Sequence, residues 1–166
     1  MASQLQLATF KTVIVPAQLS QRVWGVPSSV TLGQWMLEST WGASQLSVEC
    51  NNFFGIKAVQ GEAYQEFMTH EVVKGRTVEE MADFAKYTTA AACFSAHGKL
   101  LATLPRYASA MAVRAQVPLF CIQLQKDGYS TNPGYPTSLM TLIRQHNLTQ
   151  YDTLPPDQPA QAKEAA

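Results

Sequence analysis

The N-terminal stretch from Leu5 to Trp24 carries apolar residues that mostly recur every three or four positions. These residues are Leu7, Phe10, Val13, Ile14, Ala17 and Val23. Such spacing gathers apolar side chains on one face, so it predicts an amphipathic helix. Pro16 lies inside this stretch. Because proline removes a backbone donor and clashes with the preceding turn, we expect a kink near Val15 or two shorter helices.

A second helix is predicted from about Ser29 to Trp41, where apolar residues surround a single acid, Glu38. Ser28 or Ser29 can accept a backbone N–H at its start. Gly42 can supply the left-handed conformation that commonly ends a helix. We therefore expect Glu38 in the last turn.

The pattern changes after Gly42. Residues 43–62 are typical of irregular chain. Residues 64–73 and 76–85, joined by a turn at Lys74-Gly75, predict a β-hairpin, although the composition of residues 78–84 is equally compatible with a helix. Four helices are then expected, separated by prolines. They run from Thr89 to Thr103 with Thr88 as the cap, from Tyr107 to Val117, from Leu119 to Lys126, and from Thr137 to His146.

These elements predict a mainly helical α+β fold with one small β lobe. A cleft between the helical lobe and the hairpin lobe is the natural place for a site. The length of 166 residues, with 46% hydrophobic and 14% charged residues, fits one globular domain. We assign this domain to residues 1–152. Residues 153–166 are poor in large apolar side chains, so they are predicted to be a disordered tail.

Charge and cysteine content argue against several classes of protein. Twelve basic and twelve acidic residues cancel, so nothing favours nucleic acid as a partner. The three cysteines, Cys50, Cys93 and Cys121, have no histidine at zinc-ligand spacing, and we interpret them as small buried apolar residues, with one disulfide and one free thiol as the alternative. The histidines share no metal spacing either, so we infer no metal and no cofactor. They are His70, His97 and His146.

No membrane-directing segment is visible in the sequence. Met1 to Ala8 lack the basic and apolar regions of a signal peptide, and no later segment holds the roughly 18 uninterrupted apolar residues of a membrane span. We therefore expect no membrane insertion, and we expect a monomer.

Glu38 is the side chain best placed for chemistry. The negative end of the helix macrodipole disfavours a carboxylate in the last turn, and burial against Trp35, Leu37 or Trp41 would disfavour it further. Both effects raise the pKa. A free glutamate titrates near ~4.3, whereas a carboxyl in an apolar pocket can reach roughly 6, which suits a general acid. The alternative is an ordinary glutamate on a solvated helix face.

Three segments, in this order, resemble one protein family. They are Leu37-Glu38-Ser39-Thr40-Trp41-Gly42, then Asn51-Asn52-Phe53-Phe54-Gly55-Ile56-Lys57-Ala58, and then Gly128-Tyr129-Ser130-Thr131-Asn132-Pro133 followed by Tyr135. The chain resembles glycoside hydrolase family 73, the glucosaminidase family of peptidoglycan hydrolases, from roughly Phe10 to Leu148. This family includes a domain of the flagellar rod protein, many autolysins and phage lysins. The resemblance implies a lysozyme-like fold and an endo-β-N-acetylglucosaminidase that cleaves peptidoglycan glycan strands at the β-1,4 bond between N-acetylglucosamine and N-acetylmuramic acid.

The resemblance also implies roles for individual residues. Glu38 falls on the general acid of the family. Glu71 falls on an acidic residue before the hairpin turn and is our choice for the second catalytic group, with a solvated hairpin charge as the alternative. Tyr129 falls on a tyrosine that lines the cleft beside the acid, with burial in the core as the alternative. The remaining substrate-binding candidates are Asn52, Phe54 and Tyr107, for which turn, packing or capping roles are the alternatives.

Other functions stay open at this point. An N-acetylmuramidase or a lytic transglycosylase on the same scaffold would act on the same strands, and a transglycosylase can work without Glu71. A non-catalytic wall-binding module is a third hypothesis, against which the presence of Glu38 argues. A wall substrate places the action in the periplasm or cell wall, by an export route that the sequence does not give.

Overall fold

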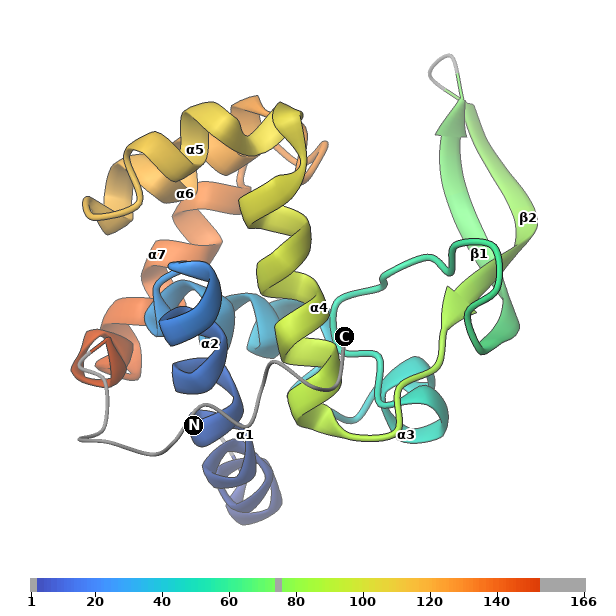
Figure 1. Cartoon of the computed structure of the whole chain (residues 1–166), viewed down its shortest axis with the longest axis horizontal. Coiled ribbons are helices and arrows are strands. Elements are labelled where there is room, and N and C mark those ends of the chain that lie inside the picture. The colour runs from blue at the N-terminus through green and yellow to red at the C-terminus, as the bar shows by residue number, and fades with distance from the viewer. Residues whose placement is uncertain (1–2, 74–75, 153–166) are drawn as a thin grey trace.

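Helices from both ends of the chain form one body, and a β-hairpin projects beside it (Figure 1). The structure, a computed structural model, describes residues 3–73 and 76–152, without the side chains of residues 70–78. The predicted turn at Lys74-Gly75 and the predicted tail at residues 153–166 therefore lie outside the described residues. The elements are α1 (Gln4–Trp24), α2 (Ser28–Glu38), α3 (Gln45–Cys50), β1 (Tyr64–Val73), β2 (Arg76–Ala85), α4 (Ala90–Thr103), η1 (Pro105–Tyr107), α5 (Ala108–Ala112), α6 (Val117–Lys126), α7 (Tyr135–Gln145) and η2 (Leu148–Tyr151). This order confirms the mainly helical α+β class.

Helix α1 continues through Pro16, so the expectation of two shorter helices is wrong. Ser3 closes its N-terminus in a capping box, in which the Ser3 hydroxyl accepts the Gln6 N–H and the Gln6 side chain accepts the Ser3 N–H. Gly25, with φ of 77°, ends the helix in the left-handed conformation. Of the predicted apolar face, Phe10, Val13 and Ala17 are buried, whereas Leu7 is exposed.

Helix α2 is capped from outside rather than by its own serines. Pro27 occupies the N-cap position and offers no side-chain acceptor, so the prediction of a cap at Ser28 or Ser29 is wrong. Instead, Gln21 Oε1 accepts the Ser28 N–H at 2.7 Å, and Asp152 accepts the Ser29 N–H at 2.7 Å and its hydroxyl at 2.9 Å. The free N–H groups of this buried helix end are thus satisfied by α1 and by the residue after η2.

The other end of α2 lies at Glu38, and not at Trp41 as predicted. The backbone leaves the helix through three successive left-handed residues, Thr40, Trp41 and Gly42, with φ values of 53°, 59° and 79°. The Ser39 hydroxyl accepts the Gly42 N–H at 2.7 Å and stabilises this exit. Glu38 therefore occupies the last helical position.

The hairpin forms from the predicted residues. Strands β1 and β2 are antiparallel, from Tyr64 opposite Ala85 to Val73 opposite Arg76. The preceding chain, predicted as irregular, contains the short helix α3, which is too short for a periodic apolar pattern to reveal.

Prolines begin the C-terminal helices rather than separate them. Pro118 and Pro136 lie in the first turn of α6 and α7, where the missing N–H has no helical partner to lose. The helix predicted from Tyr107 to Val117 is only the short pair η1 and α5. Helix α4 begins at Ala90 with Thr89, and not Thr88, as its cap.

The core lies between the helices and contains fully buried Trp35, Phe94, Leu101 and Phe120. The three cysteines are buried free thiols, as predicted. Helices α1 and α4 approach closely at Gly98, where a Cβ atom would lie 2.3 Å from Ser20 Oγ. Within the described parts of the chain, no helix has the length and apolar character needed to cross a bilayer.

Candidate active site

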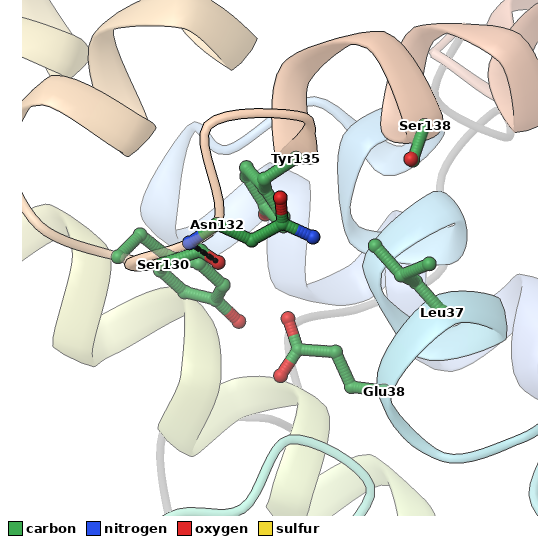
Figure 2. Close-up of a pocket in the computed structure, with 7 residues that line it drawn as sticks. Leu37, Glu38, Ser130, Asn132, Tyr135 and Ser138 are labelled. Atoms are coloured by element: carbon green, nitrogen blue, oxygen red, sulfur yellow. Dashed lines mark hydrogen bonds between the residues drawn. The ribbon is translucent and has the colours of Figure 1, made fainter. Parts of the chain in front are cut away.

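A pocket of about 250 Å³ opens at the C-terminal end of α2 (Figure 2). Its lining comes from α2, from the loop between α6 and α7, and from α7, and it consists of Leu37, Glu38, Tyr129, Ser130, Asn132, Tyr135 and Ser138. Figure 2 shows the carboxyl of Glu38 pointing across the pocket toward Asn132 and Tyr135. Among the described residues, the hairpin contributes none to this lining. A cleft with the hairpin as its opposite wall therefore stays a prediction.

Glu38 has the electrostatic character expected of an acid. Burial raises its pKa from 4.5 to about 7, and a hydrogen bond with the Tyr129 side chain acts in the opposite direction. The Glu38 side chain is nevertheless exposed to solvent. Both observations fit a carboxyl in an open pocket, with protein around most of it and water reaching it from one side. The predicted upward shift in pKa is confirmed.

The neighbours of Glu38 differ from those predicted. Only Leu37 of the three expected residues lines the pocket. Trp35 and Trp41 pack edge-to-face against each other, with ring centroids 6.0 Å apart, as part of the core. Tyr129, from the loop after α6, and Tyr135, from α7, line the pocket beside the acid instead.

Tyr129 lines the pocket from a turn that is held by hydrogen bonds. Gly128 precedes it with φ of 82°, in the left-handed region that favours glycine. The Arg106 guanidinium donates to the carbonyls of Asp127 and Gly128 at 3.0 and 3.1 Å. The Asp127 carboxylate accepts the Ser109 hydroxyl at 2.8 Å, which ties the turn to α5. The backbone on which Tyr129 stands is therefore fixed from two sides.

Three tyrosines lie together beside Glu38. The Tyr129 ring centroid is 5.5 Å from that of Tyr135 and 6.2 Å from that of Tyr107. Burial, in each case the largest cause, raises the pKa of all three hydroxyls, and the nearby Glu38 contributes to each shift. The hydroxyls therefore stay protonated near neutral pH. Tyr107 itself is 5% exposed and is not among the residues that line the pocket, so its contact with substrate stays a prediction.

Asn52 and Phe54 lie outside the pocket lining. The Asn52 amide donates to the carbonyls of Ile56 and Ala85 at 2.8 and 2.9 Å and accepts the Ile56 N–H at 3.0 Å, which joins the loop to the base of the hairpin. Phe54 stacks on His97, with ring centroids 4.0 Å apart. Both side chains make contacts within the protein, and their binding of substrate stays a prediction.

Glu71 belongs to β1, where its backbone pairs with Val78. Its side chain lies outside the described residues, so its catalytic role also stays a prediction. Tyr135 was not predicted as part of the site, although it lies in the quoted motif, and neither was His97. His97 lies in no motif that could have drawn attention to it.

A larger hollow of about 480 Å³ lies between α4 and the loop at residues 56–62. Its one carboxylate, Glu62, accepts the Val59 N–H at 3.1 Å on an exposed loop. Across the residues that the structure describes, no cluster of His, Cys, Asp and Glu is arranged to hold a metal ion. The Glu38 pocket is therefore the candidate active site.

Comparison with known proteins identifies the family. Residues 15–148 match the glucosaminidase family model, described as mannosyl-glycoprotein endo-beta-N-acetylglucosaminidase. The chain belongs to this family of glycoside hydrolases. The matched range includes Glu38, Tyr129 and the hairpin, and the resemblance noted in the sequence is confirmed.

Individual relatives agree with this assignment. Exo-glucosaminidase LytG of Bacillus subtilis is 29% identical over 145 residues, which cover 84% of this chain and 51% of LytG. Peptidoglycan hydrolase FlgJ of Salmonella typhimurium is 34% identical over 137 residues, which cover 79% of this chain and 43% of FlgJ. The chain thus spans about half, or less, of these relatives. The catalytic domain of the autolysin Auto from Listeria monocytogenes aligns with a TM-score of 0.79 and 27% identity, over 91% of this chain and 89% of that domain. These likenesses confirm the lysozyme-like fold.

Proposed function

We propose that this chain hydrolyses peptidoglycan at the β-1,4 bond between N-acetylglucosamine and N-acetylmuramic acid, with Glu38 as the general acid. The observation that supports this most is a carboxyl in an open pocket whose pKa is raised to about 7, in a chain of the glucosaminidase family. At that pKa a substantial fraction of Glu38 carries a proton near neutral pH, whereas an unperturbed glutamate would be almost wholly ionised.

The proposed chemistry is proton donation to a leaving sugar. Glu38 gives its proton to the glycosidic oxygen as the bond from that oxygen to the anomeric carbon breaks, and the leaving sugar departs as an alcohol. Glu38 then becomes a carboxylate. The Tyr129 hydrogen bond lowers the pKa of Glu38, which means that it favours this carboxylate form and supports the transfer.

A second group must stabilise charge or activate water on the other face of the sugar. Glu71 is proposed for this role from the family resemblance. A mechanism that uses the N-acetyl group of the substrate, or a single acid, would dispense with Glu71. Replacement of Glu71 separates these possibilities.

The pocket supplies polar groups for a sugar. Ser130, Asn132 and Ser138 line it with hydroxyl and amide groups that can bond ring substituents. The volume of about 250 Å³ is smaller than a pocket for a whole drug-sized ligand, so we assign it to one sugar of a longer strand. Action on peptidoglycan places the protein in the periplasm or cell wall, as a flagellar, autolytic or phage enzyme.

Mass spectrometry of digested peptidoglycan tests the bond that is cleaved. Purified sacculi are incubated with the protein, and the new glycan ends are reduced and identified. Reducing N-acetylglucosamine ends support the proposal. Reducing N-acetylmuramic ends would establish a muramidase, anhydro ends a lytic transglycosylase, and binding without new ends a wall-binding module, and each of these would overturn it.

A further inference from the structure

His97 is a buried polar residue that the proposed chemistry does not use. It lies on α4, is 1% exposed, and has its ring stacked on Phe54. Its Nε2 lies 3.3 Å from the Tyr129 hydroxyl oxygen. Its Nδ1 is buried and has no hydrogen-bond partner among the described residues. An imidazole inside a helical core with one ring nitrogen committed to a pocket tyrosine calls for an explanation.

The hydrogen-bond partners of the two His97 ring nitrogens indicate which nitrogen carries the proton. A buried N–H without an acceptor is rarer in proteins than an acceptor without a donor, so the unpartnered Nδ1 is better placed as a lone pair. The proton is then on Nε2, and His97 donates to the Tyr129 oxygen. Once Glu38 is a carboxylate it can only accept, so a Tyr129 hydroxyl that donates to it, as the lowering effect of Tyr129 on the Glu38 pKa indicates, leaves the Tyr129 oxygen to accept from His97.

We propose that His97 is a positioning residue, which donates from Nε2 to the Tyr129 oxygen and so directs the Tyr129 proton at the Glu38 carboxyl. This inference rests on the proposed role of Glu38 as the acid. His97 touches neither the substrate nor Glu38 in this scheme, and it acts through Tyr129 alone.

No proton passes through His97 in the proposed step. When Glu38 gives its proton to the glycosidic oxygen, the resulting carboxylate accepts the hydrogen bond from Tyr129, and Tyr129 keeps its own proton. His97 stays neutral throughout, because burial lowers its pKa to about 3. A donor at Nε2 polarises the Tyr129 hydroxyl and strengthens its bond to the carboxylate. Loss of that donor therefore makes Glu38 a weaker acid with a higher pKa.

The titratable groups that face Glu38 are tyrosines from separate elements. They are Tyr107 of η1, Tyr129 of the loop after α6, and Tyr135 of α7. Gln34 on α2 holds the Tyr135 hydroxyl, to which its Nε2 donates at 2.7 Å. Of these three tyrosines, all among the described residues, only Tyr129 forms a hydrogen bond with His97. Replacement of His97 therefore directly alters Tyr129 and not Tyr107 or Tyr135.

The first test compares two substitutions of similar length, His97→Gln and His97→Met. Glutamine keeps an N–H donor near the Nε2 position, and methionine fills the same space without one. Turnover of purified peptidoglycan is measured from about pH 5 to pH 9, a range in which His97 does not titrate. His97→Met should lower the plateau rate about tenfold, the value of one hydrogen bond of ordinary strength, and move the alkaline limb of the profile to higher pH. His97→Gln should return both values to near wild type.

A matched control separates positioning from packing. Phe94→Leu disturbs the same Phe54 ring, whose centroid lies 5.0 Å from that of Phe94, without removing the donor to Tyr129. This variant should leave the position of the alkaline limb unchanged. An equal shift of the limb in Phe94→Leu, or an unshifted limb in His97→Met, would overturn the inference.

A second test does not depend on catalysis. Nitrogen NMR of histidine-labelled protein reports which ring nitrogen is protonated, and the His97 signals are identified by their loss in His97→Gln. Protonation at Nε2 supports the inference, and protonation at Nδ1 overturns it even if Glu38 is the acid. Failure of the proposed function itself would appear differently, as normal hydrolysis by Glu38→Gln or as no hydrolysis by the wild type.

Discussion

Replacing Glu38 by glutamine should stabilise the fold at alkaline pH. The folded protein holds the Glu38 proton with a pKa of about 7, against 4.5 for the free side chain. The folded state therefore binds this proton more tightly than the unfolded state does. Stability attributable to Glu38 is at its highest below about pH 4.5, falls as the pH rises through about 7, and is then level. Glutamine has the same shape and no such dependence on pH.

The size of this effect follows from the shift and from the exposure of the site. A rise in pKa from 4.5 to about 7 corresponds to a ceiling of roughly 3 kcal/mol. Water reaches the Glu38 side chain, and solvent screening reduces this value to about 1 kcal/mol. We therefore expect the free energy of unfolding of Glu38→Gln, relative to wild type, to increase by about 1 kcal/mol between pH 5 and pH 9.

Urea unfolding at those two pH values measures the difference. Glu66→Gln is the matched control, because Glu66 is an exposed hairpin glutamate outside the pocket. It controls for the general effect of replacing a carboxylate of this chain by an amide. An equal effect of Glu38→Gln at both pH values would refute the reasoning, since it would mean that folding does not desolvate the carboxyl.

Three further predictions concern positions around the site. Gly98→Ala should lower the free energy of unfolding by about 1 to 3 kcal/mol, because the new Cβ meets Ser20 Oγ at 2.3 Å; a neutral result in urea unfolding would contradict the close approach of α1 and α4. Asp152→Ala should cost about 1 kcal/mol in the same assay by leaving the Ser29 N–H without its acceptor, and Asp152→Asn, which keeps one oxygen, should cost less. Glu71→Gln should cut turnover strongly with little change in binding of purified peptidoglycan, and turnover within a few-fold of wild type would remove Glu71 from the mechanism.

The pattern of the sequence predicted the elements whose stability depends on repeated apolar positions or paired strands. Buried Phe10, Val13 and Ala17 of α1 and both strands of the hairpin were found where they were expected. The raised pKa of Glu38 was also predictable, because it needs only a carboxyl with protein around most of it. In these cases the local sequence pattern is sufficient to predict the structure.

Tertiary contacts explain most of what the sequence did not predict. The N-terminus of α2 is capped by Gln21, which lies on α1 and accepts the Ser28 N–H, and by Asp152, which is distant along the chain and accepts the Ser29 N–H. The end of α2 depends on left-handed backbone at Thr40, which a β-branched residue rarely adopts. The link from His97 to Tyr129 joins α4 to the loop after α6, and no spacing in the sequence reveals it.

The most direct test of Glu38 as the acid is the turnover of purified peptidoglycan by Glu38→Gln relative to wild type, measured near pH 6 with both proteins shown to be folded. The amide preserves the shape of the side chain but cannot give a proton to the glycosidic oxygen. We expect a loss of roughly 10²- to 10⁴-fold, which is the usual contribution of positioned acid catalysis. Glu38→Gln that retains more than a small fraction of wild-type turnover, with contaminating hydrolase excluded, would contradict the assignment of Glu38.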